Sequence, residues 1–350
     1  MENSESVRLA MKKKKLWICS DIWMDTLPFF DRSQLGLKMA LLSPRFDILV
    51  DKHFDGKREL TIWRQIRIGK KGIKAKQFAV MNSKPTPDRP LPNKIRFTNL
   101  CINYIDHSVL AFLRSNQQIF DKGTDLDLDL YTEAKDVQPI WDVFAREIWP
   151  IFVTNIRRLQ FYEGDHFDNL RRNISPTILS NLDIISIHSA DLLPTAIADD
   201  GPNATDGQAL SKWLNTPTKD GQSKQLRCCD YKHSSVNIGW VNNFREAFLH
   251  ATTPSASYII RIELVGPTPI EPFELMNERT NEKLTLEKEV DHGTTDVDLL
   301  LKRWQIGETI QWEDEKTYKL NNVNITLYGD CIGSLSPPKA GQKNANSRQK

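Results

Sequence analysis

The feature that most constrains the fold is an alternation of expected strands and helices between residues 95 and 265. The expected strands are Ile95–Asn103, Leu126–Tyr131, Arg157–Tyr162, Asp183–His188, Gln225–Tyr231 and Tyr258–Val265. Each is followed by a loop and then by a stretch whose apolar residues recur at helical spacing. Two strands that are joined through a helix usually pair in parallel. The pattern therefore predicts a mixed α/β fold with a largely parallel sheet.

The stretches between these strands carry the helical pattern. Asp106 stands at an N-cap position, directly before an apolar stripe that ends near Leu113. The other expected helices cover residues 137–152, 167–179, 208–214 and 238–251. Their apolar sides are expected to pack on the sheet.

One unit follows a known repeat spacing. Residues 182–192, LDIISIHSADL, match the leucine-rich-repeat pattern L-x-x-L-x-L-x-x-N-x-L, with Ala190 at the asparagine position. Residues 156–161 match the first half of that pattern. In such a repeat the outward strand residues form a binding surface. The other units deviate, so we expect an LRR-like strand–helix domain, and a doubly wound sheet remains the alternative.

After Gly266 the alternation ends. Residues 272–276 and 284–288 predict a β-hairpin, Leu299–Trp304 a helix, and Asn324–Tyr328 a last strand. We expect this C-terminal region, with its added β-hairpin, to close the open end of the sheet, because repeat domains need capped ends.

The N-terminal segment Trp17–Phe54 predicts a small three-helix unit. A short helix ends at Pro28, a second follows Asp31, and a third begins at Ser43-Pro44, where serine caps and proline takes the first helical position. The apolar surface exceeds what three short helices bury among themselves. Either the rest of the chain or a partner is expected to cover it.

This segment resembles an F-box, the domain that binds Skp1 in cullin-based ubiquitin ligases. The resemblance rests on an apolar pair, a short helix, an L-x-x-x-x-L spacing and the run LLSPRF at residues 41–46. The segment departs from the usual pattern at Ile18-Cys19, where Leu-Pro is common, and at Phe46, where Trp is common. The run LGLKMALLSPRFDILVDKHF and later segments such as YIDHSVLAFL and DGQALSKWLNTP are similar to F-box families expanded in nematodes.

The resemblance implies a non-catalytic substrate-receptor subunit of an SCF-type ubiquitin ligase, without metal or cofactor. Its implied partners are a Skp1-like adaptor with its cullin complex and a protein substrate. Two alternatives stay open: an LRR-like binding scaffold that does not use Skp1, and, less favoured, an α/β enzyme with a site at the strand ends. The residues expected to contact Skp1 are Ile18, Ile22, Trp23, Leu27, Pro28, Leu35, Leu37, Leu41 and Leu42.

The expected domain boundaries follow composition. Four prolines within residues 84–92 cannot continue a helix or an inner strand, so a stiff linker is expected there. The expected parts are a disordered tail (1–15), an F-box (16–56), a β-hairpin with the proline-rich linker (57–92), an LRR-like substrate-recognition domain (93–335) and a second disordered tail (336–350).

Two clusters could carry chemistry. Asp125, Asp127 and Asp129 alternate with leucines and therefore share one face of a strand. A calcium loop needs a glycine turn and a later glutamate, and neither is present. We therefore interpret the three aspartates as a solvated acidic stripe, which in an LRR-like domain would be suited to a basic substrate. The second cluster, Cys228–Asp230 with His233, is interpreted as structural thiols, because vicinal cysteines cannot both reach one metal comfortably.

Composition excludes several functions. A net charge of +2 gives no electrostatic reason to expect a nucleic-acid or membrane partner. Five scattered cysteines fit a reducing compartment, so we expect an intracellular protein in the cytoplasm, the nucleus or both. No local phosphate-binding loop, nucleophile elbow or zinc-protease motif occurs.

Overall fold

The computed structural model divides the chain into two compact units, residues 1–58 and 59–350, which are described separately. The expected linker at 84–92, the tails 1–15 and 337–350, and the second half of the first expected hairpin lie outside the described residues. The structure describes residues 18–30, 35–40, 42–54, 58–64, 95–131, 138–161, 164–230, 236–290, 296–313, 320–328 and 331–336.

The first unit is helical, as expected. Its helices are α1 (Ser20–Thr26), the 3₁₀ helix η1 (Leu27–Phe29), the π-helix η2 (Leu35–Met39) and α3 (Pro44–His53). The Ser43 cap is confirmed, because its side chain accepts a hydrogen bond from the Phe46 amide at 3.3 Å. The cap expected at Asp31 lies outside the described residues.

This unit has a core of its own. Leu27, Leu35, Ala40, Leu49 and Val50 are buried. Half-buried aromatic side chains surround them, among them Trp23, whose ring meets that of Phe46 edge-on at 4.8 Å.

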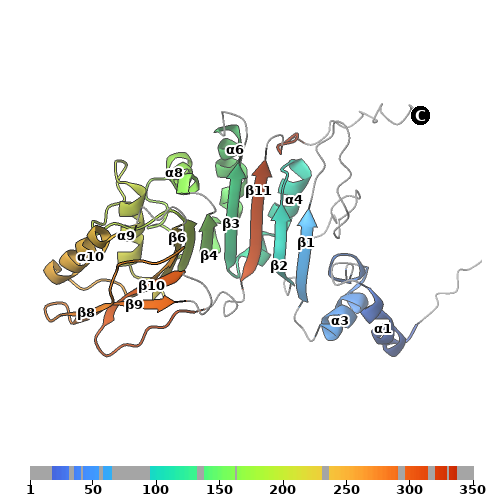
Figure 1. The fold of residues 1–350 in the computed structure, drawn as a ribbon. Helices are drawn as coiled ribbons and strands as arrows, with labels where there is room; N and C mark the ends of the chain where they lie inside the picture. The colour runs from blue at the N-terminus through green and yellow to red at the C-terminus, as the bar shows by residue number, and fades with distance from the viewer. Residues whose placement is uncertain are drawn as a thin grey trace, which may run out of the picture. The chain divides into compact units, whose positions relative to one another are not determined.

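The second unit is built on an open eleven-stranded sheet with the order β1-β2-β11-β3-β4-β5-β6-β7-β10-β9-β8 (Figure 1). From β2 to β7 along this order the strands pair in parallel, and β7, β10, β9 and β8 pair antiparallel. The strands are β1 (Arg58–Arg64), β2 (Ile95–Ile102), β3 (Thr124–Tyr131), β4 (Ile156–Phe161), β5 (Ser186–Ala190), β6 (Lys224–Asp230), β7 (Tyr258–Leu264), β8 (Phe273–Asn277), β9 (Glu282–Val290), β10 (Val297–Gln305) and β11 (Asn321–Tyr328).

Of two C-terminal expectations, one was wrong and the other holds only in part. The helix expected at Leu299–Trp304 is strand β10, because it pairs on both sides with β7 and β9, and this tertiary pairing overrides the helix-forming leucines. The last strand does not close an end of the sheet: β11 inserts between β2 and β3, and β10, β9 and β8 cover the end next to β7. The hairpin of β8 and β9 is confirmed.

Asn321 explains why β11 is held at this internal position. Its buried amide nitrogen donates to the carbonyls of Ile119 at 2.9 Å and Gly123 at 3.2 Å. Its oxygen accepts from the Phe97 amide of β2 at 2.9 Å. One side chain therefore joins β11 to β2 and to the connection between α5 and β3.

The helices lie between the strands in sequence, as expected. Asp106 caps α4 by accepting from the amides of Ser108 and Val109, both at 2.9 Å. Figure 1 shows α4 and α6 behind the sheet strands. The helices are α4 (His107–Ser115), α5 (Gln117–Phe120), α6 (Gln138–Val143), the π-helix η3 (Phe144–Ile148), α7 (Trp149–Phe152), the 3₁₀ helix η4 (Val153–Asn155), α8 (Gly164–Asn173), α9 (Asp206–Asn215) and α10 (Ile238–His250).

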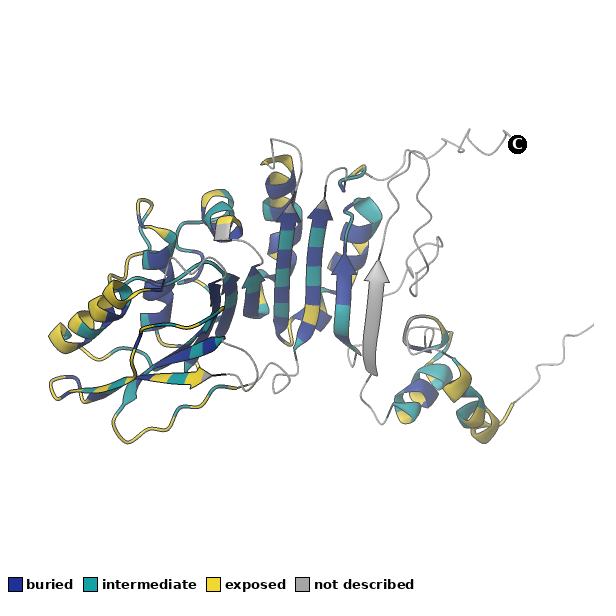
Figure 2. Cartoon of the chain, viewed as in Figure 1, coloured by how far each residue is buried: buried dark blue, intermediate teal, exposed yellow. Residues whose placement is uncertain are grey.

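The two faces of the sheet differ in burial. On β3, Leu126 and Leu128 are fully buried on the helix-covered face, and the aspartates between them are half-buried (Figure 2). The same alternation continues on β11, where Val323 and Ile325 are buried. The helices therefore bury one face, and we call the opposite side the polar face.

Candidate functional site: the polar face and the N-terminal apolar surface

Strand register lines up polar side chains across the polar face. In the middle row each residue is the register partner of the next, from β11 to β7. This row consists of Asn324, Asp127, Gln160, His188, Arg227 and Arg261. No single sequence segment contains more than one member of the row.

The structure places Asp125, Asp127 and Asp129 together on this face, all half-buried. Asp125 lies 3.4 Å from the Arg158 guanidinium of β4. Asp127 accepts a hydrogen bond from the Asn324 amide of β11 at 2.8 Å. Burial, and then the Asp127 charge, raise the pKa of the neighbouring Cys101 thiol to about 11, so this thiol stays protonated at neutral pH.

Further along the face, charges are matched in pairs. Arg227 lies 2.7 Å from Glu263, and Arg261 pairs with Asp298 and lies 3.6 Å from Glu263. Burial alone would raise the pKa of Glu263, but hydrogen bonds from Cys229 and Arg227 and the charges of the two arginines lower it. Glu263 therefore stays ionised.

A segment between β10 and β11, Ile306–Glu313, contacts the polar face near the amino end of β6 and in the middle of β7; we call it the strap. In the amide orientation that satisfies both groups, Gln225 donates to the Glu313 carbonyl at 3.1 Å and accepts from its amide at 2.9 Å. The Arg261 guanidinium lies 5.9 Å from the centre of the Trp312 ring. Gln225 is only 3% exposed.

The two vicinal cysteines have different surroundings. Cys228 is buried on the helix side, donates to the Leu192 carbonyl at 3.1 Å, and has a pKa raised well above its ordinary value, chiefly by burial. Cys229 lies on the polar face, donates to Glu263 at 3.1 Å, and is 3.5 Å from Nε2 of His188. Sequence analysis missed this Cys–His pair because only strand register brings the two together.

Among the described residues, no three His, Cys, Asp or Glu side chains are grouped so that they could hold a metal ion. His233, a member of the sequence cluster, lies outside the described residues.

The first unit exposes apolar side chains despite its own core. Ile22 is 56% exposed and Leu42 is 65% exposed, and Ile18 and Pro28 are also exposed. Of the other expected Skp1 contacts, Leu27 and Leu35 lie in the core, Trp23 is half-buried, and Leu41 and the Leu37 side chain lie outside the described residues.

Sequence analysis overlooked two further exposed residues of this unit. Phe29 is 87% exposed and Ile48 is 67% exposed. Their positions carry no special sequence signal, because an apolar residue in a short helix is usually expected inside.

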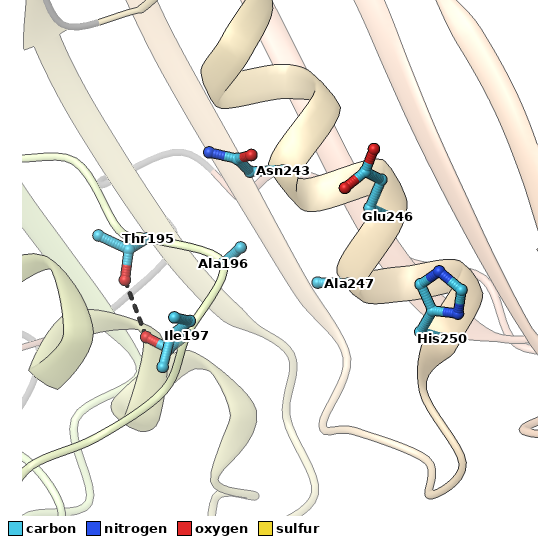
Figure 3. A pocket seen from close by; sticks show the side chains of 7 residues that line it. All are labelled: Thr195, Ala196, Ile197, Asn243, Glu246, Ala247 and His250. Atoms are coloured by element: carbon cyan, nitrogen blue, oxygen red, sulfur yellow. Dashed lines mark hydrogen bonds between the residues drawn. The ribbon is translucent and has the colours of Figure 1, made fainter.

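A hollow of about 370 Å³ lies between the loop after β5 and helix α10 (Figure 3). Side chains of Asn243, Glu246 and His250 on α10 line one side, and the loop around Ile197 lines the other. Ile197 itself is 67% exposed, so this is an open depression and does not enclose a ligand.

Comparisons of the chain with protein-family models, with curated proteins and with solved structures find no match. In the described part of the chain, no helix combines the length and apolar character that a membrane crossing requires.

Proposed function

We propose that this protein is the substrate-receptor subunit of an SCF-type ubiquitin ligase. In this proposal the N-terminal helical unit is an F-box that docks on Skp1, and the second unit holds a protein substrate. The mechanism is proximity: the bound ligase machinery transfers ubiquitin to a substrate that is already held nearby, so the encounter becomes effectively intramolecular.

The observation that carries the proposal is the apolar surface of the first unit. Its described residues form a buried core, yet Ile18, Ile22, Phe29 and Leu42 remain exposed. Several exposed apolar side chains on so small a unit support a role in binding a protein partner. We assign the Skp1 contact to the exposed members of the expected set, and we assign Leu27 and Leu35 to the core that supports them.

The second unit fits the role of receptor domain. Strands followed by helices on one face support an LRR-like reading, in which the open face binds a protein. The insertion of β11 departs from a simple repeat, because a solenoid adds its strands in chain order. A scaffold that uses this face without Skp1 remains the second candidate.

A pull-down with purified Skp1 tests the proposal. We expect the full-length protein to bind, and Ile22→Asp with Leu42→Asp to abolish binding without unfolding the unit, because both side chains are exposed. Ile48→Asp is the matched control: it places the same charge at an exposed apolar position outside the expected contact set. The F-box assignment would be wrong if the native protein did not bind Skp1, or if the control variant lost as much Skp1 binding as the double variant.

A further inference from the structure

The polar face has two halves that differ in charge balance. On β6, β7 and β10, Arg227 and Arg261 each face a carboxylate. On β11, β3, β4 and β5, the outward side chains include three carboxylates and one guanidinium, that of Arg158, while the rest of the middle row is amide or imidazole. This second half therefore carries a formal charge of −2 with His188 neutral.

The polar face already holds one chain segment, the strap. Gln225 binds the strap through both polar groups of the Glu313 backbone, which is how a side-chain amide can hold an extended peptide of any sequence. In the register row of Gln225, Ser186 is 5% exposed and Ile259 is fully buried. In the middle row, the strap reaches Arg261 through Trp312, whereas Gln160 and His188 on β4 and β5 are only half-buried. A band beside the strap is therefore partly exposed; we call it the open band.

The open band offers the same chemistry as the strap contact. The Asn324 amide is engaged within the face, because it donates to Asp127 and accepts from the Thr326 hydroxyl. The Gln160 amide, on the other side of Asp127 in register, offers a donor and an acceptor to a peptide backbone beside that carboxylate. Asp129 follows two residues along β3 on the same face, about 7 Å away. A lysine or arginine between these carboxylates would gain charge-assisted hydrogen bonds.

We infer that the half of the polar face formed by β11, β3, β4 and β5 binds an extended, lysine- or arginine-rich segment of a protein partner. The segment runs across the strands beside the strap. This inference rests on the proposed function, since it names the kind of substrate that the receptor domain takes.

Fluorescence anisotropy with two short labelled peptides tests the inference on the full-length protein. One peptide alternates lysine and serine, and the other alternates glutamate and serine. We expect binding of the lysine peptide only, with affinity falling as salt rises. Asp127→Asn with Asp129→Asn should weaken binding about tenfold or more, a loss of about 1.4 kcal/mol.

The control removes the same amount of charge elsewhere. Glu246→Gln with Glu278→Gln changes two exposed carboxylates outside the polar face, and we expect a change of about twofold at most. Binding of both peptides, binding of neither, or equal loss in the control pair would overturn the inference. Skp1 binding is measured separately, so loss of the peptide result leaves the F-box assignment standing, and the reverse also holds.

Discussion

Glu282 on β9 and Arg303 on β10 form a two-point ion pair under helix α10. Arg303 donates from Nη2 to Oε2 at 2.7 Å and from Nε to Oε1 at 3.1 Å. Glu282 is fully buried and also accepts from the Ser255 amide at 2.9 Å. The Arg303 guanidinium lies 5.3 Å from the Phe248 ring, so the pair joins the C-terminal strands to α10.

Arg303→Met should destabilise the second unit by about 3–5 kcal/mol, because it leaves a buried carboxylate without its cation. Urea unfolding at pH 7 measures this loss. The double variant Glu282→Leu, Arg303→Met should recover part of the stability, since it removes both charges. A cost of about 1 kcal/mol for the single variant, as for an exposed pair, would contradict the assignment.

Asn321→Leu should cost about 3 kcal/mol of unfolding free energy, because the Phe97 amide and the Ile119 carbonyl lose their side-chain partner inside the protein. The neighbouring Asn322 is exposed and serves as the control. Asn322→Ala should change stability by about 0.5 kcal/mol or less. Similar losses for both variants would refute a special role for Asn321.

Lys224 should make stability pH-dependent in the alkaline range. Burial lowers its pKa from 10.5 to about 8, although the Asp183 charge partly opposes this. Folding therefore favours the neutral amine, and the penalty for the charged form, on the order of 3 kcal/mol, disappears as pH rises from about 8 to 10.5. The measurement is the free energy of unfolding at several pH values between about 8 and 10.5. It should rise with pH in the native protein and stay level in Lys224→Met.

Gln225→Leu should release the strap locally. The Glu313 amide loses its acceptor, so its hydrogen exchange should accelerate. Gln160→Leu, which alters the same polar face two strands away, should leave that amide unchanged. Unchanged exchange in Gln225→Leu would show that other contacts hold the strap.

Ser43→Ala should destabilise α3 by about 1 kcal/mol, because the Phe46 amide loses its cap. Hydrogen exchange of the α3 amides measures the change. Ser43→Asp keeps an acceptor at the cap and should retain most of the protection. An equal effect of both substitutions would contradict the capping role.

Local patterns predicted most of the strands and helices, because alternation and capping are encoded within a few residues. Leu126, Leu128 and Leu130 with their intervening aspartates indicated both a strand and its two faces. Three consecutive leucines at 299–301 are compatible with the helical repeat and with the strand repeat. Only the pairing with β7 and β9 shows that this segment is a strand. The middle row of the polar face was beyond prediction, since it depends on the register of six strands from distant parts of the chain.

The internal position of β11 also sets an order of events during synthesis. Strands β2 and β3 are made early, and each has another neighbour, β1 or β4, but the edges that they turn toward each other stay unpaired until β11 emerges more than 180 residues later. A nascent chain that stops before β11 therefore exposes two unpaired strand edges, which are prone to aggregation. Only a chain translated through its last strand joins the early strands to the rest of the sheet, so truncated products are left open to capture by chaperones and proteases.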